Sequence, residues 1–218
     1  MLDDKLMGVY ISQNCVRFAE KSPDKFKWLS EPYVAYRNKA IKENKDIAMS
    51  IWYAYDDGAY NKYGMEFSEL SKALTEYAKV TIANNPLEYL HQVVFYSWRD
   101  FWKPTLYWNY NDFNFKYANK FFRGIWYVQE PILYLFRFVF LLLVPVIIIK
   151  AIKKRTIDIG FIIMSVIFIA SILQALLTYG TNNRFSFPFE FLIIISVLLY
   201  FKDRDWWFLK PLVNKFKF

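Results

Sequence analysis

Three long apolar blocks follow residue 125, and they decide what this chain can fold into. They are PILYLFRFVFLLLVPVIII (131–149), IDIGFIIMSVIFIASILQALL (157–177) and FPFEFLIIISVLLYF (187–201). A helix needs about 20 apolar residues to cross a bilayer, and the first two blocks are long enough. The third falls short at about 1.5 Å per residue unless flanking residues extend it. The pattern predicts a mainly α, polytopic membrane protein with three transmembrane helices.

The distribution of basic residues predicts the orientation of these helices. The net charge is +8, and the excess gathers in the 150–156 linker and in the 202–218 tail, whereas the 178–186 connection carries only Arg184. Positively charged loops stay in the cytoplasm. We therefore expect a multi-pass protein of the cell (inner or plasma) membrane. Residues 1–125 would form an extracytoplasmic domain, 126–201 the transmembrane region and 202–218 a cytoplasmic basic tail. The basic excess then reflects topology, so we expect no nucleic acid as a partner.

The amino-terminal region raises the question of how it is exported. The first 20 residues have no basic start followed by an apolar core, so they do not form a signal peptide. A domain of this size does not readily cross a membrane without one. We therefore expect the chain to be the C-terminal part of a longer protein, missing an N-terminal half. A split gene and an inverted topology are the alternatives.

Two amphipathic helices are predicted in the extracytoplasmic region. In the first, 68–83, one face carries Leu70, Leu74, Tyr77 and Thr81, and Ser68 is the expected N-cap. Asn85 and Pro86 then start a second helix. Its apolar stripe contains Leu87, Leu90, Val94, Trp98 and Phe101.

The segment 101–127 alternates Phe, Tyr and Trp with Lys, Asn and Asp. Such amphipathic rings prefer the headgroup zone of a membrane. We expect this segment to be an interfacial anchor, or alternatively the wall of a site for a sugar or a lipid headgroup.

Few side chains outside the apolar blocks suggest chemistry. His91 and Cys15 are the only residues of their types, which excludes a His-rich metal site and an internal disulfide. Asp56 and Asp57 form a pair that could bind a cation or act as acid and base, although Gly58 beside them equally favours an exposed turn. We expect no cofactor and no metal, with a divalent cation left open.

Charged residues within the apolar blocks are the main site candidates. Arg137, Arg184 and Glu190 are all expected toward the outer side of the membrane. Ionisable groups in spans usually face a cavity or each other, and guanidinium groups bind phosphate in a bidentate way. The three residues are therefore candidates for a phosphate or lipid-headgroup site. Snorkelling, or an Arg–Glu pair with no ligand, is the alternative.

Two motifs carry a resemblance to a known family. RFSFP (184–188) fits an Arg-aromatic-x-x-Pro pattern leading into a final membrane helix. NNPLEYLHQVVFYSWRDFWKP (84–104) is similar to an Asn-Pro-x-x-Tyr-Leu helix that ends in Phe-Trp before the late spans. In this order they resemble the C-terminal portion of polytopic GT-C glycosyltransferases of the protein O-mannosyltransferase and aminoarabinose transferase type (family 39). The resemblance covers about residues 68–201.

The resemblance implies transfer of a sugar from a polyprenyl-phosphate carrier to a lipid, protein or glycan acceptor on the outer face of the membrane. Arg184 would contact the donor phosphate, and Tyr89 and Trp102 would belong to a helix packed over the site. The family's catalytic acidic residue follows a first span and has no counterpart here, so the chain alone is expected to be inactive. Asn182 and Asn183 stand where an acidic residue often precedes the arginine.

Two other functions remain open from the sequence. One is a non-catalytic membrane subunit whose extracytoplasmic domain binds a partner or a glycan. The other is a transport component with Arg137 and Glu190 lining a path.

Overall fold

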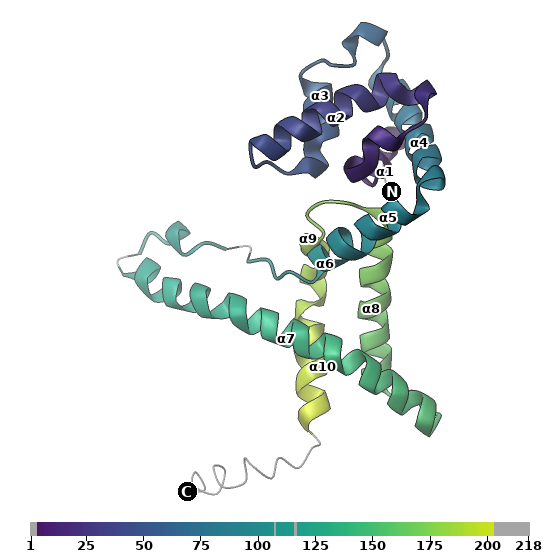
Figure 1. Ribbon diagram of the computed structural model, residues 1–218. Helices are drawn as coiled ribbons and strands as arrows, with labels where there is room; N and C mark the ends of the chain where they lie inside the picture. The colour runs from purple at the N-terminus through teal and green to yellow at the C-terminus, as the bar shows by residue number, and fades with distance from the viewer. Residues whose placement is uncertain (1–3, 107, 116, 203–218) are drawn as a thin grey trace, which may run out of the picture. The chain divides into compact units, whose positions relative to one another are not determined.

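Within residues 4–106, 108–115 and 117–202, which the computed structural model describes, every regular element is helical. The predicted mainly α class is therefore confirmed. The chain forms two compact units (Figure 1). Unit 1 comprises the described residues of Met1–Thr105 together with Ala170–Ser186. Unit 2 comprises those of Leu106–Ile169 and Phe187–Phe218. Residues 203–218 of the predicted tail lie outside the described residues.

Unit 1 contains the short helices of the amino-terminal region. Its α-helices are α1 (Asp4–Gln13), α2 (Lys27–Lys42), α3 (Ser50–Asp56), α4 (Phe67–Asn84), α5 (Pro86–Gln92), α6 (Arg99–Phe101) and α9 (Asn183–Ser186). The part of α8 (Ile159–Leu177) from Ala170 onward also belongs to unit 1. Short 3₁₀ turns lie between them: η1 (Val16–Lys21), η2 (Asp24–Phe26), η3 (Ile47–Met49) and η4 (Asn61–Tyr63). A π-helical segment, η5 (Val93–Trp98), joins α5 to α6 without a break, so that Pro86–Phe101 is one continuous helix.

The α4 helix confirms the predicted amphipathic face and corrects its start. Leu70, Leu74, Tyr77 and Thr81 are all buried. The N-cap is Glu66 rather than Ser68, because Glu66 and Glu69 form a reciprocal capping box that satisfies two amide groups. One residue of α1 allows the two helices to meet. A Cβ on Gly8 would lie 1.7 Å from the Ser71 carbonyl oxygen, so only glycine fits this crossing.

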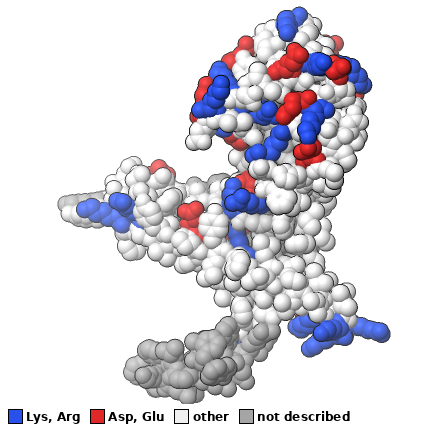
Figure 2. Space-filling model, viewed as in Figure 1, with Lys and Arg blue, Asp and Glu red and all other residues white. Residues whose placement is uncertain are grey.

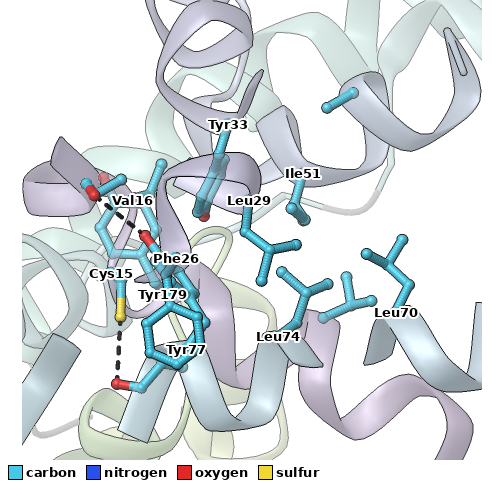
Figure 3. Close-up of a cluster of buried hydrophobic side chains, with 14 of the residues drawn as sticks. Cys15, Val16, Phe26, Leu29, Tyr33, Ile51, Leu70, Leu74, Tyr77 and Tyr179 are labelled. Atoms are coloured by element: carbon cyan, nitrogen blue, oxygen red, sulfur yellow. Dashed lines mark hydrogen bonds between the residues drawn. The ribbon is translucent and has the colours of Figure 1, made fainter. Parts of the chain in front are cut away.

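The core of unit 1 is rich in tyrosine, and three of its buried tyrosine hydroxyls have a backbone acceptor. Tyr33, Tyr60 and Tyr77 donate to the carbonyl oxygens of Ser12, Leu29 and Ala19 at 3.2–3.4 Å. Figure 3 shows Tyr33 and Tyr77 among the aliphatic residues of the cluster, beside Cys15. Burial raises the pKa of the Cys15 thiol, and the thiol donates to the Ala78 carbonyl. The single cysteine of the chain is thus a core residue.

In the part of the chain that the structure describes, three helices are long and apolar enough to cross a membrane. They are α7 (Ala118–Lys154), α8 (Ile159–Leu177) and the stretch Asn183–Lys202, in which α9, η7 (Phe187–Phe189) and α10 (Glu190–Lys202) follow one another. The flanking residues do extend the short third block. Charged side chains gather over unit 1 on the face shown in Figure 2, while the lengths of the spans are largely white and a blue group marks the carboxyl end of α7.

The α7 helix has two distinct faces along its 37 residues. Phe122, Trp126, Leu133, Phe140 and Ile147 recur at helical spacing and are buried or half-buried. The opposite face is exposed. Before α7, the chain folds back through η6 (Tyr110–Asp112), and this loop packs against the first turns of the helix.

Candidate functional site

The connection between α8 and α9 is built into unit 1 by side chains from the amino-terminal region. The last carbonyl groups of a helix lack intrahelical partners. Here the Leu176 carbonyl accepts from Tyr89 Oη at 2.7 Å, and the Leu177 carbonyl accepts from Asn14 Nδ2 at 3.0 Å. In addition, Trp98 Nε1 donates to Ser171 Oγ at 2.9 Å. The carboxyl end of this candidate span is therefore capped by distant residues.

Residues 179–182, which connect α8 to α9, also bond to and pack against the amino-terminal region of unit 1. Tyr179 joins the unit 1 core, where Figure 3 shows it near Cys15 and Phe26. Gly180 has φ +87°, and a Cβ there would lie 2.3 Å from the Ala48 Cβ, so glycine is required on both counts. The Asn182 backbone N–H donates to Asp100 Oδ2 at 2.8 Å, and Asn182 Nδ2 donates to the Ser97 carbonyl at 3.2 Å.

A cavity of about 400 Å³ lies where this connection meets the π-helical segment. One of the two segments that carry the family resemblance, 84–104, lines it together with residues that directly precede the other. The 84–104 segment contributes Tyr96, Ser97, Arg99, Asp100 and Lys103. The connection before α9 contributes Tyr179, Gly180 and Thr181, and α9 contributes its first residue, Asn183. The π-helix is relevant because such segments are rare and occur frequently at functional sites.

Three cations and two carboxylates line this cavity, so its walls carry a net positive charge. We call the three, Arg17, Arg99 and Lys103, the cavity cations. The carboxylates are already engaged: Asp100 receives Lys103 at 2.9 Å as well as the Asn182 N–H, and Asp46 caps η3 through the Ala48 N–H. The arrangement can receive an anion.

Arg17 is held rigidly at one wall of the cavity. Its guanidinium carbon lies 3.4 Å from the centre of the Tyr96 ring, and its Nε donates to Tyr179 Oη at 2.8 Å. Its backbone N–H donates to the buried Gln92 side chain. Burial raises the pKa of Tyr179 while the Arg17 charge acts in the opposite direction. Such stacking leaves the outer guanidinium N–H groups available to a ligand.

Arg184 lies on the other side of the Tyr179–Thr181 turn. It lines a cavity of about 240 Å³ that shares Asp46, Tyr179, Gly180 and Thr181 with the larger one. Its guanidinium carbon is 4.7 Å from the Phe185 ring centre. Sequence reasoning selected Arg184 but missed Arg17, Arg99 and Lys103. The Trp-Arg-Asp-Phe-Trp-Lys run within 98–103 was the available signal, whereas Arg17 lies too far away in sequence to be recognised.

The other predicted site residues occupy different positions. Arg137 of α7 and Glu190 of α10 form an ion pair within unit 2. Arg137 is 2% exposed and Glu190 is 14% exposed. This is the Arg–Glu pairing that the sequence left open. Tyr89 and Trp102 both pack inside unit 1, Trp102 edge-to-face with Trp98 and Phe101.

The carboxylate pair Asp56 and Asp57 lines a further cavity of about 250 Å³ together with Tyr36, Lys39 and Tyr53. Asp57 lies 3.8 Å from Lys39 Nζ. Among the described residues, no group of three or more His, Cys, Asp and Glu side chains is arranged to hold a metal ion.

Comparisons of the chain with protein-family models, curated proteins and solved structures give no match. The site itself is therefore the basis for inferring function.

Proposed function

We propose that this chain binds a polyprenyl-phosphate-linked sugar and forms part of a membrane glycosyltransferase that transfers the sugar to a lipid, protein or glycan acceptor. One observation carries the proposal. The 84–104 segment, one of the two that resemble the GT-C family, lines a cavity together with the cavity cations and with residues that directly precede the second segment at Arg184.

The position of the cavity suits a lipid phosphate. Tyr179 and Gly180 follow directly after α8, a candidate span that ends at Leu177. A phosphate attached to a membrane-embedded chain lies at this level, at the end of the hydrocarbon core. Arg99 and Lys103 are exposed and Arg17 is stacked, so all three could approach the phosphate oxygens.

The chemistry of transfer gives these cations a role. The bond that breaks joins the sugar to the phosphate, and negative charge develops on the departing phosphate. Cationic donors fixed in advance stabilise that charge. Deprotonation of the acceptor needs a base as well, which we do not assign to a residue of this chain.

The proposal is tested by measuring the affinity of the purified full chain for polyprenyl phosphate in lipid nanodiscs. The variant Arg99→Gln with Lys103→Gln removes two charge-assisted contacts. Each is worth about 1.5–3 kcal/mol, so we expect affinity to fall by at least about tenfold. The matched control is Lys72→Gln with Lys79→Gln, which removes two exposed cations of α4 that do not line the cavity.

Equal affinity of both double variants and the native chain would reject the cavity as the donor site. Arg184→Ala is measured in parallel, because its cavity adjoins the first across the Tyr179–Thr181 turn. A loss only in Arg184→Ala would move the phosphate to the smaller cavity.

A second function, a non-catalytic subunit that binds a glycan, has its own supporting observation. The cavity around Asp56 and Asp57 combines two tyrosine rings with carboxylates, and sugars are commonly held by ring faces together with acidic acceptors of their hydroxyl groups. Binding of soluble oligosaccharides that is lost in Tyr53→Ala but kept in Arg99→Gln with Lys103→Gln would favour this function.

A further inference from the structure

The α7 helix is longer than a bilayer requires. Its 37 residues measure about 55 Å at ~1.5 Å per residue, against a hydrocarbon core of about 30 Å. Counting back about 20 residues from Ile149, the last apolar residue before Lys150, reaches Glu130. The first turns, 118–129, therefore lie beyond the hydrocarbon core.

These first turns nevertheless continue the exposed apolar face of the span. Phe121, Ile125, Val128, Ile132 and Leu135 follow one another at spacings of four and three residues, which places them on one side of the helix. All five are exposed, from 42% for Ile125 to 67% for Phe121. We call Phe121, Ile125 and Val128 the apolar stripe of 118–129.

The opposite side of the same turns is already covered by protein. The Phe113 ring stacks on Phe122 with centres 4.2 Å apart. Trp108 Nε1 donates to Gln129 Oε1 at 3.0 Å, and Trp126 Nε1 donates to the Trp108 carbonyl at 3.1 Å. The folded-back loop therefore fixes the rotation of the helix and leaves the apolar stripe outward.

Two cations, Lys120 and Arg123, lie on the same turns as the apolar stripe. Arg123 lies 5.6 Å from the Tyr127 ring centre and 5.8 Å from that of Tyr110, and Lys120 lies 5.8 Å from that of Tyr117. Tyr and Trp rings with nearby Lys and Arg are the composition of the headgroup layer. Long basic side chains lie along apolar surface there and extend their charge to the phosphates.

From these observations we infer that 118–129, with the 108–115 loop packed on it, lies in the headgroup layer of the bilayer that α7 crosses. The partner of the apolar stripe is the lipid surface, because the stripe is continuous with the lipid-facing side of the span. Lys120 and Arg123 face the lipid phosphates. The inference does not depend on the proposed function.

The test uses site-directed spin labels on the full chain in vesicles of phosphatidylethanolamine and phosphatidylglycerol. Ile125→Cys and Phe121→Cys each receive a label, and collisions with oxygen, which concentrates in the bilayer, are compared with those of a water-soluble nickel chelate. Ile41→Cys in α2 is the matched control, since Ile41 is an exposed isoleucine of unit 1. The native chain, whose Cys15 is buried, gives the background.

Oxygen accessibility above nickel accessibility at positions 121 and 125, with the reverse at 41, is the expected result. Nickel accessibility as high at 125 as at 41 would place the stripe in water and overturn the inference. Spin–spin broadening at high dilution in lipid, with low accessibility to both reagents, would overturn it in favour of a second copy of the chain. Both labelled side chains are exposed, so the variants should fold as the native chain does.

Discussion

The Asn182 side chain uses its amide group in a way that no carboxylate can reproduce. It is fully buried, its Nδ2 donates to the carbonyl oxygens of Ser97 and Thr178, and its Oδ1 accepts from Thr178 Oγ1. An aspartate has acceptors only. The resemblance suggested an acidic residue just before the arginine, and the structure gives a physical reason for asparagine at this position.

We expect Asn182→Asp to destabilise unit 1 by about 2 kcal/mol or more, because one buried and one partly buried carbonyl group lose their donor and a charge is added beside them. The change is measured as the shift in unfolding midpoint of the purified chain in detergent.

Asn183→Asp is the control for that substitution. Asn183 Oδ1 accepts from the Arg184 N–H at 3.0 Å, and a carboxylate would preserve this bond. A loss as large in Asn183→Asp as in Asn182→Asp would show that added charge, rather than the lost donor, is responsible.

At the scale of elements, the ion pair of Arg137 and Glu190 joins α7 to α10 on the buried face of α7. Removing one member of a buried pair leaves an uncompensated charge and costs about 3–5 kcal/mol, whereas replacing both members by apolar residues costs much less. We therefore expect the pair to favour one register of packing between α7 and α10.

We therefore expect Arg137→Met and Glu190→Leu to be strongly destabilising alone, and the double variant to be more stable than either. Unfolding of the chain in mixed detergent micelles measures all three. Lys150→Met is the comparison, because the Lys150–Asp158 pair is half-exposed and a surface pair is worth at most about 1 kcal/mol. Additive losses in the double variant would contradict a coupled pair.

Comparison of the helices with the sequence shows which of their features could be predicted. The face of α4 followed from helical periodicity, and the three spans followed from apolar length. The N-cap of α4 was missed because Ser68 is the commoner capping residue, while Glu66 caps through its partner Glu69. The π-helical turn at Val93–Trp98 was not predicted from helical periodicity. In the structure its Trp98 indole donates to Ser171 of α8, and its Ser97 carbonyl accepts from Asn182.

At the scale of the whole molecule, the sequence did not predict which segments of the chain make up unit 1. Asn14 and Tyr89 reach carbonyl groups of α8 that lie 163 and 87 residues away, and no local pattern indicates such partners. The same holds for the cavity, which combines Arg17 with Lys103 and Tyr179. Arg184 could be selected as a site candidate from the sequence only because it is a charged residue next to an apolar block.

The predicted orientation leads to a labelling experiment on intact cells. Ile41→Cys in unit 1 should react with a membrane-impermeant maleimide from outside, and Lys154→Cys at the end of α7 only after permeabilisation, because basic linkers remain in the cytoplasm. Both positions are exposed. The opposite pattern would invert the topology and place the cavity on the cytoplasmic side.

The incorporation of Tyr179 into the unit 1 core sets an order on biogenesis. A ribosome adds roughly 5–20 residues per second, so several seconds separate the synthesis of α4 from that of the residue that completes its surroundings. During that interval the first two spans are inserted into the membrane. The amino-terminal helices have then been synthesised, but their core still lacks Tyr179. Because the core of unit 1 is completed late, we expect a chaperone to bind the amino-terminal helices during synthesis, or a folding intermediate to mature slowly.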